Sequence, residues 1–202
     1  MTDYSITELD ISYQELTQLP DDIDKYTNLK KLECSHNKLI SLDNLPPNLE
    51  VLYCSFNKLI SLDNLPPKLE VLYCCFNKLT SLDNLPLTLK KLFCHTNQIT
   101  SLDNIPVNLE SLCCFHNKLT SLDNLPHKLE VLYCDNNQLP SLDNLPPSLI
   151  ELECSKNNIT NLDNLPQKLE ILYCRGNPLI YNFEPTLENI RKYRKIPENI
   201  RK

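Results

Sequence analysis

Apolar residues recur along this chain with a period of 20 residues. The segment LKKLECSHNKLISLDNLPPN at 29–48 is followed by LEVLYCSFNKLISLDNLPPK at 49–68, and this register continues without insertion or deletion to residue 179. Eight copies therefore begin at Leu29, Leu49, Leu69, Leu89, Leu109, Leu129, Leu149 and Leu169. A ninth, divergent unit of 23 residues precedes them, with Gln14 where the later copies have Asn. Short copies that cannot bury an apolar face alone predict a stacked solenoid.

Each copy combines a strand pattern with a proline-containing half. In the segment 51–55, Leu52 and Cys54 face one side of an extended chain, while Val51, Tyr53 and Ser55 face the other. Stacking these segments at ~4.8 Å predicts one parallel sheet. The second half reads DNLP, and proline lacks the N–H that a helix needs. We therefore expect extended or polyproline II backbone on the opposite side, with little or no helix.

The consensus LxxLxCxxNxLxxLDNLPxx resembles the leucine-rich repeat, with Cys at the third apolar position. The resemblance covers residues 6–179, and the short unit with its Leu-Pro turn is similar to the repeats of bacterial effector proteins. The near-identical copies and the Asn-, Ile- and Lys-rich composition look like the repeat proteins of giant, mimivirus-like DNA viruses. The resemblance implies a horseshoe-like solenoid with its parallel β-sheet on the concave face. It also implies a structural role for the asparagines Asn37, Asn57, Asn77, Asn97, Asn117, Asn137, Asn157 and Asn177.

The repeat pattern predicts three parts: a divergent N-terminal repeat or cap at 1–28, eight in-register repeats at 29–179, and a C-terminal cap with a basic helix or tail at 180–202. Pro185 suits the first position of a short helix, where its missing N–H has no helical partner. Leu187, Ile190 and Tyr193 then fall on one helical face. Pro197 is expected to end the helix. The exposed side carries Arg191, Lys192, Arg194 and Lys195.

Composition and charge narrow the classes of function. A single glycine, Gly176, excludes the phosphate loops of dinucleotide-binding, P-loop and kinase proteins, since each needs at least two glycines. A net charge of −6 disfavours a general nucleic-acid binder. The N-terminus shows no secretory signal, and no stretch approaches the ~20 apolar residues of a membrane span. We therefore expect a cytoplasmic protein, in the host cytoplasm if viral, with reduced cysteines and neither nucleic-acid nor membrane partners.

Eight of the ten cysteines share one inward position of the repeat: Cys34, Cys54, Cys74, Cys94, Cys114, Cys134, Cys154 and Cys174. We interpret them as core filler, because a free cysteine behaves as a small apolar side chain. Cys75 and Cys113 point to the open strand face, within ~10 Å of His95 and His116 by stacking. Such a group can bind zinc, and a Cys–His pair can be nucleophilic. The interpretation we adopt is ordinary surface residues, with no metal, cofactor or catalytic role.

The outward strand positions hold the candidate functional residues. Their aromatic side chains predict a contiguous exposed patch, and a monomer rarely exposes a large apolar patch without use. Tyr and Phe are also enriched at interface cores. The alternative is that the rings only stabilise the sheet by packing against their neighbours. The predicted partner-binding face comprises Tyr53, Phe56, Tyr73, Phe76, Phe93, His95, Phe115, Tyr133 and Tyr173.

Aspartates form a further column, in the DNLP half: Asp43, Asp63, Asp83, Asp103, Asp123, Asp143 and Asp163. Carboxylates stacked ~5 Å apart repel one another unless they are bonded or bridged by cations. Two roles remain open for this column. The carboxylates can recruit calcium weakly, or they can accept hydrogen bonds from N–H groups of the turns.

These features predict a monomeric, non-catalytic protein–protein interaction module that binds a partner protein through the concave strand face. The resemblance to effector and viral repeat proteins implies a host partner. The alternative is a substrate-recognition adaptor for a ubiquitin ligase, since some effectors with this repeat carry a catalytic domain after it. Only 23 residues follow the last repeat here, so an adaptor would recruit the enzyme through the basic C-terminal segment. An enzyme that uses Cys75 and His95 is the least favoured hypothesis.

Overall fold

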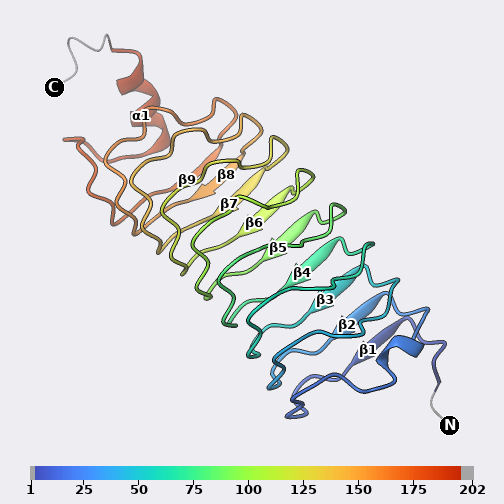
Figure 1. Ribbon diagram of the computed structural model, residues 1–202. Coiled ribbons are helices and arrows are strands. Elements are labelled where there is room, and N and C mark those ends of the chain that lie inside the picture. The colour runs from blue at the N-terminus through green and yellow to red at the C-terminus, as the bar shows by residue number, and fades with distance from the viewer. Residues whose placement is uncertain (1–2, 197–202) are drawn as a thin grey trace.

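A computed structural model describes residues 3–196, and these form one parallel sheet of nine short strands. The strands lie side by side in chain order (Figure 1), and each pairs with the next in register, as Leu52 does with Leu72. Leu9 pairs with Leu32 across the longer first unit. The predicted solenoid is therefore confirmed. The strands are β1 Glu8–Asp10, β2 Lys31–Glu33, β3 Val51–Tyr53, β4 Val71–Tyr73, β5 Lys91–Phe93, β6 Ser111–Cys113, β7 Val131–Tyr133, β8 Glu151–Glu153 and β9 Ile171–Tyr173.

Inward-facing leucines and cysteines form one continuous core. Leu52 and Leu72 are fully buried, and the eight cysteines of the inward column are at most 5% exposed. All of these cysteines are free thiols. Burying one leucine contributes about 1.5–3 kcal/mol, and each unit finds this burial only against its neighbours. The prediction that the column fills the core is confirmed.

The asparagine column satisfies the backbone of each turn. Asn117 Nδ2 donates to the carbonyl oxygens of Cys114 at 3.0 Å and of Cys94 in the preceding repeat at 3.2 Å. Its Oδ1 accepts the N–H of Ile99 at 3.0 Å. Equivalent bonds recur in the other repeats, for example at Asn57 and Asn157. Each side-chain amide therefore ties two successive repeats together, and its role is structural.

The residue before each of these asparagines has a left-handed backbone. In seven repeats this residue is not glycine, and its φ lies between 50° and 56°. Gly176 holds the same place in the last repeat with φ 72°. Glycine adopts this conformation freely, whereas other residues are strained by about 1–2 kcal/mol. The seven are His36, Phe56, Phe76, Thr96, His116, Asn136 and Lys156.

A single short α-helix closes the described part of the chain. Helix α1 spans Leu187–Arg194, and the Oγ1 of its N-cap Thr186 accepts the N–H of Asn189 at 3.2 Å. Pro185 therefore precedes the cap instead of starting the helix, because threonine supplies the acceptor that a free helical N–H needs. Ile190 is fully buried, as expected for the apolar face. The predicted stop at Pro197 lies outside the described residues, and the boundaries 1–28, 29–179 and 180–202 stay predictions.

Two of the four basic side chains expected on the exposed side of α1 instead reach back to the last two repeats. Arg191 donates to the carbonyl oxygens of Leu169 at 2.5 Å and Gln167 at 3.1 Å. Arg194 donates to that of Leu165 at 2.9 Å. Elsewhere in residues 3–196 the side opposite the sheet holds no helix apart from one 3-10 turn at Ile23–Lys25, as expected. Its backbone is not simply extended, because each DNLP half makes turns. No helix in this range is long and apolar enough to cross a membrane.

Candidate functional site on the strand face

The outward positions of the strands form one continuous surface, here called the strand face. Along β3, Leu52 is fully buried, while Val51 and Tyr53 on either side of it are half-buried. The parallel register brings the same position of each repeat together, so Tyr73 lies between Tyr53 and Phe93. Side chains on this face therefore meet their counterparts from neighbouring repeats at the strand spacing.

Tyr53, Tyr73 and Phe93 form a stacked group, here called the strand ladder. The ring centroids of Tyr53 and Tyr73 are 4.6 Å apart with planes at 14°, and those of Tyr73 and Phe93 are 4.1 Å apart at 2°. Because stacking covers the ring faces, all three residues are only half-buried and not freely exposed. The expectation of an open aromatic patch is corrected in this respect, since ring edges rather than ring faces meet the solvent.

A second stack, the turn ladder, runs beside the first and consists of Tyr13, His36, Phe56 and Phe76. Successive centroids are 4.2, 4.3 and 4.2 Å apart. Phe56 and Phe76 are 42% and 40% exposed, more than the rings of the strand ladder. Tyr13 was not among the predicted residues. It precedes Gln14 as His36 precedes Asn37, and this equivalence was the signal in the sequence that could have identified it.

His95 and Phe115 extend the turn ladder to the middle of the sheet. Their rings stack at 4.1 Å, and Phe76 meets His95 edge-on at 5.3 Å. Burial, together with the nearby His116, lowers the pKa of His95. The imidazole is therefore neutral at pH 7 and contributes to the face as an aromatic ring.

Tyr133 and Tyr173 do not continue the strand ladder. Cys113 separates Tyr133 from Phe93 in register, and Glu153 separates Tyr133 from Tyr173. The hydroxyl of Tyr133 donates to Glu151 Oε1 at 2.7 Å. This hydrogen bond raises the pKa of Tyr133 to about 12. Tyr173 lies on the last strand and is 54% exposed. The predicted residues therefore divide into a stacked region over the first strands and a more acidic region over β7–β9.

Cys75 and Cys113 are buried, which corrects the expectation that they lie exposed on the open face. They are 4% and 5% exposed, and Cys113 is a short side chain between Phe93 and Tyr133 in register. Burial raises the pKa of Cys75 to about 11 and that of Cys113 to about 12, so both thiols stay protonated at neutral pH. Within residues 3–196 no group of three or more His, Cys, Asp or Glu could hold a metal ion. The zinc and nucleophile hypotheses therefore gain no support.

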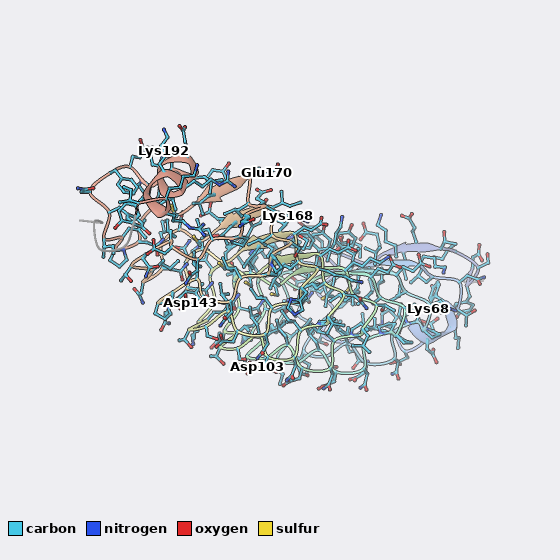
Figure 2. All side chains as sticks on the ribbon, turned by 90° about the horizontal axis from the view of Figure 1, so that it is seen from above. Lys68, Asp103, Asp143, Lys168, Glu170 and Lys192 are labelled. Carbon is cyan, nitrogen blue, oxygen red and sulfur yellow. The ribbon has the colours of Figure 1, made fainter. Side chains whose placement is uncertain are left out.

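Aspartates of the DNLP half are bonded by the repeat that follows them. Asn104 Nδ2 donates to Asp83 Oδ1 at 2.7 Å, and Asn164 Nδ2 donates to Asp143 Oδ1 at 2.8 Å. These bonds hold the pKa of both carboxyl groups below the usual range. Figure 2 shows Asp103 and Asp143 on the margin of the solenoid away from the strands. Side-chain amides thus supply the donors expected from turn N–H groups, and no geometry favours calcium.

The sequence and the fold are similar to leucine-rich repeats. The family model described as Leucine Rich repeats (2 copies) matches residues 47–87 and 107–147. No curated protein matched the chain. Solved structures with the same fold include several bacterial proteins, and three of them are compared below.

YopM from Yersinia enterocolitica is 31% identical with a TM-score of 0.66, covering 90% of this chain and 49% of its own. The functional domain of InlJ from Listeria monocytogenes, described as including a cysteine ladder, is 37% identical with a TM-score of 0.76, covering 88% of this chain and 41% of its own. The repeat domain of a Shigella effector is 28% identical with a TM-score of 0.59, covering 96% and 78%. The chain thus spans less than half of the first two structures.

Proposed function

Since this chain belongs to the leucine-rich repeat family, with repeats of about 20 residues, we propose that it is a non-catalytic module that binds a partner protein through its strand face. The observation that carries this proposal is the pair of aromatic ladders that run side by side across the strands. The strand ladder and the turn ladder together offer a broad surface of aromatic edges on a rigid sheet.

Stacking prepares these rings for binding. A ring held between two neighbours has little side-chain freedom left to lose when a partner docks, so less entropy opposes the association. Phe56 and Phe76 leave 42% and 40% of their surface open, and they gain from burial against an apolar partner. Packing within the sheet and binding a partner are thus compatible roles for the same rings.

A host protein is the kind of partner that we propose. Support comes from the similarity to YopM and to the repeat domain of a Shigella effector. The similarity in composition to repeat proteins of giant viruses points the same way. On this proposal the module acts in the cytoplasm of the host cell as a monomer.

The adaptor alternative receives less support from the C-terminal segment. An adaptor that recruits a ubiquitin ligase through this segment needs free basic side chains. Arg191 and Arg194 instead bond the carbonyl oxygens of Leu169 and Leu165, in the last two repeats. Lys192 pairs with Glu188 at 2.6 Å. We therefore favour direct binding at the strand face.

Proximity labelling and pull-down with ladder variants test the proposed function. Tyr53→Ser, Tyr73→Ser and Phe93→Ser combined should reduce capture of the partner at least about tenfold, since aromatic anchors contribute 1–2 kcal/mol or more each. Phe56→Ser with Phe76→Ser should do the same with less effect on folding, because these rings are more exposed.

The matched control replaces three exposed apolar residues outside the ladders, Ile40, Ile60 and Leu87, which are 62%, 65% and 70% exposed. Serine at these positions should leave capture unchanged. Circular dichroism of every variant separates loss of binding from loss of folding. An unchanged set of captured proteins with both ladder variants, in folded protein, shows that the strand face is not the site.

A further inference from the structure

A small hollow opens on the strand face over β7–β9, where the extended turn ladder ends at Phe115. Its volume is about 220 Å³. Three aromatic and three acidic side chains line it: Phe115, Tyr133, Tyr173, Asp135, Glu151 and Glu153. This combination of ring surfaces and carboxylates is absent from the strand ladder, and it indicates a ligand different from an apolar partner side chain.

The hollow is present where the row of rings is interrupted. Tyr133, Glu153 and Tyr173 follow one another in register on β7, β8 and β9. The two tyrosines are therefore two strand spacings apart, or about 10 Å. Rings on adjacent strands of the strand ladder stack at 4.1–4.6 Å and leave no room between them. Each van der Waals contact takes about 3.5–4 Å, and the side chain between the two rings is Glu153, so a group that enters the hollow meets this carboxylate as well as the rings.

The three carboxylates make the hollow negative. Glu151 accepts the hydroxyl of Tyr133 at 2.7 Å, and Glu153 accepts the N–H of Ser155 at 3.0 Å. Asp135 accepts Asn136 Nδ2, a neutral donor, at 2.6 Å. The five ion pairs formed within residues 3–196 include none of the three acids. Three negative charges thus converge on a hollow of one side chain's size without a paired cation.

Two other charged residues, Glu33 and Arg175, show how the acids of the hollow differ from the rest of the strand face. Glu33 occupies the position of Glu153 toward the other end of the sheet, but its strand also carries a cation, Lys31, which pairs with Glu8 at 3.0 Å, whereas the strand of Glu153 carries Glu151. Arg175 follows β9, two residues after Tyr173. It is exposed and lines a larger hollow at the open edge of β9 that Glu153 and Tyr173 also line, but none of the ion pairs within residues 3–196 joins it to Glu153. The acids over β7–β9 are therefore the ones left for an external cation.

We propose that this hollow binds one cationic side chain, an arginine or a lysine of the partner protein. A cation between aromatic rings is attracted by their faces. A planar guanidinium can in addition stack on tyrosine and bond carboxylates through its fork of donors. The volume is below the 300–1,000 Å³ typical of small-molecule pockets, which fits a single side chain. The proposal rests on the proposed function, since it names the chemistry of the partner that the same face would bind.

A titration with a minimal arginine tests this proposal. N-acetyl-arginine N-methylamide is added to the ¹⁵N-labelled full chain, and amide chemical shifts are followed. Saturable shifts are expected on β7–β9, and the neutral isostere N-acetyl-citrulline N-methylamide should bind at least about tenfold more weakly. Equal binding of the two compounds, or shifts spread over the whole sheet, overturns the proposal.

Matched variants locate the site. Glu153→Gln and Tyr173→Ala should each weaken arginine binding several-fold, whereas Glu33→Gln should leave it unchanged. Wild-type affinity in Glu153→Gln also overturns the proposal. If arginine fails to bind while the ladder variants still lose the partner, this proposal fails and the proposed function stands. If arginine binds while those variants capture the same proteins, the proposed function fails instead.

Discussion

A left-handed residue precedes each buried asparagine, and only the last repeat fills this place with glycine. The side chain at this position is directed so that Tyr13, His36, Phe56 and Phe76 stack on one another. Sequence could predict the column but not its backbone, because Phe, Thr and Lys rarely adopt positive φ. Gly176 was the clearest local signal, and Asn136 was a weaker one. The strained conformation persists because the asparagine bonds on either side of the turn fix its geometry.

Thr96→Gly tests this strain. Thr96 has φ 56°, and a β-branched residue is an outlier there. Relief of the strain should exceed the entropic cost of glycine and the loss of the Thr96 Oγ1 contact to His95, leaving the variant about 0.5–1 kcal/mol more stable in denaturant unfolding. Thr100→Gly is the control, since no positive φ occurs there, and it should be neutral or destabilising. Destabilisation of equal size in both variants would contradict the strain argument.

At the scale of elements, the strands and the cap were predictable to different degrees. Strand positions and register followed from a 20-residue period that is kept from residue 29 to residue 179, so Leu52 and Leu72 could be paired without a structure. The helix was predicted from Leu187, Ile190 and Tyr193, but its basic side was interpreted as free. Whether Arg191 points to solvent or to a carbonyl depends on the open edge of the last repeat, which no local pattern describes.

Arg191→Ala should loosen the C-terminal end of the solenoid. The variant leaves the carbonyl oxygens of Leu169 and Gln167 without this donor, which costs about 1–3 kcal/mol where such groups are buried. In a repeat protein the loss is local. Hydrogen exchange should therefore accelerate in α1, β9 and β8 and stay unchanged in β2–β4. Lys195→Ala, an exposed residue next to the helix, is the control, and equal acceleration in both variants contradicts the capping role.

For the molecule as a whole, function depends on what neighbouring repeats hold, not on any single repeat. The column of aromatic residues was predictable, because register alone makes Tyr53, Tyr73 and Phe93 neighbours. Their stacking, the burial of Cys75 and Cys113, and the hollow beside Glu153 were not. Each depends on the relative sizes of side chains in three successive repeats, as when Cys113 lies between Phe93 and Tyr133. The consensus sequence of the repeat does not show these differences in side-chain size between one repeat and the next.

The same stacking buries ten thiols in one domain, and this predicts a steep loss of stability at alkaline pH. A thiol in an unfolded chain has a pKa of about 8.5, whereas burial raises the pKa of Cys75 to about 11 and that of Cys113 to about 12. The thiols therefore stay protonated to a higher pH in the folded state than in the unfolded chain. The stabilisation is complete below about pH 8.5 and is lost as the pH rises toward 11–12.

Within this window each buried thiol removes about 1.4 kcal/mol of stability per pH unit. The inward column adds to the slope, because burial also raises the pKa of thiols such as Cys54 and Cys94. Melting temperatures measured with a reductant should be nearly constant from about pH 6.5 to 8 and fall steeply above about pH 9. In the double variant Cys75→Ser, Cys113→Ser, the melting temperature should decrease less steeply with pH, because two of the ionising thiols are removed. A wild-type curve no steeper than that of the double variant would show that the two thiols already ionise in the folded state.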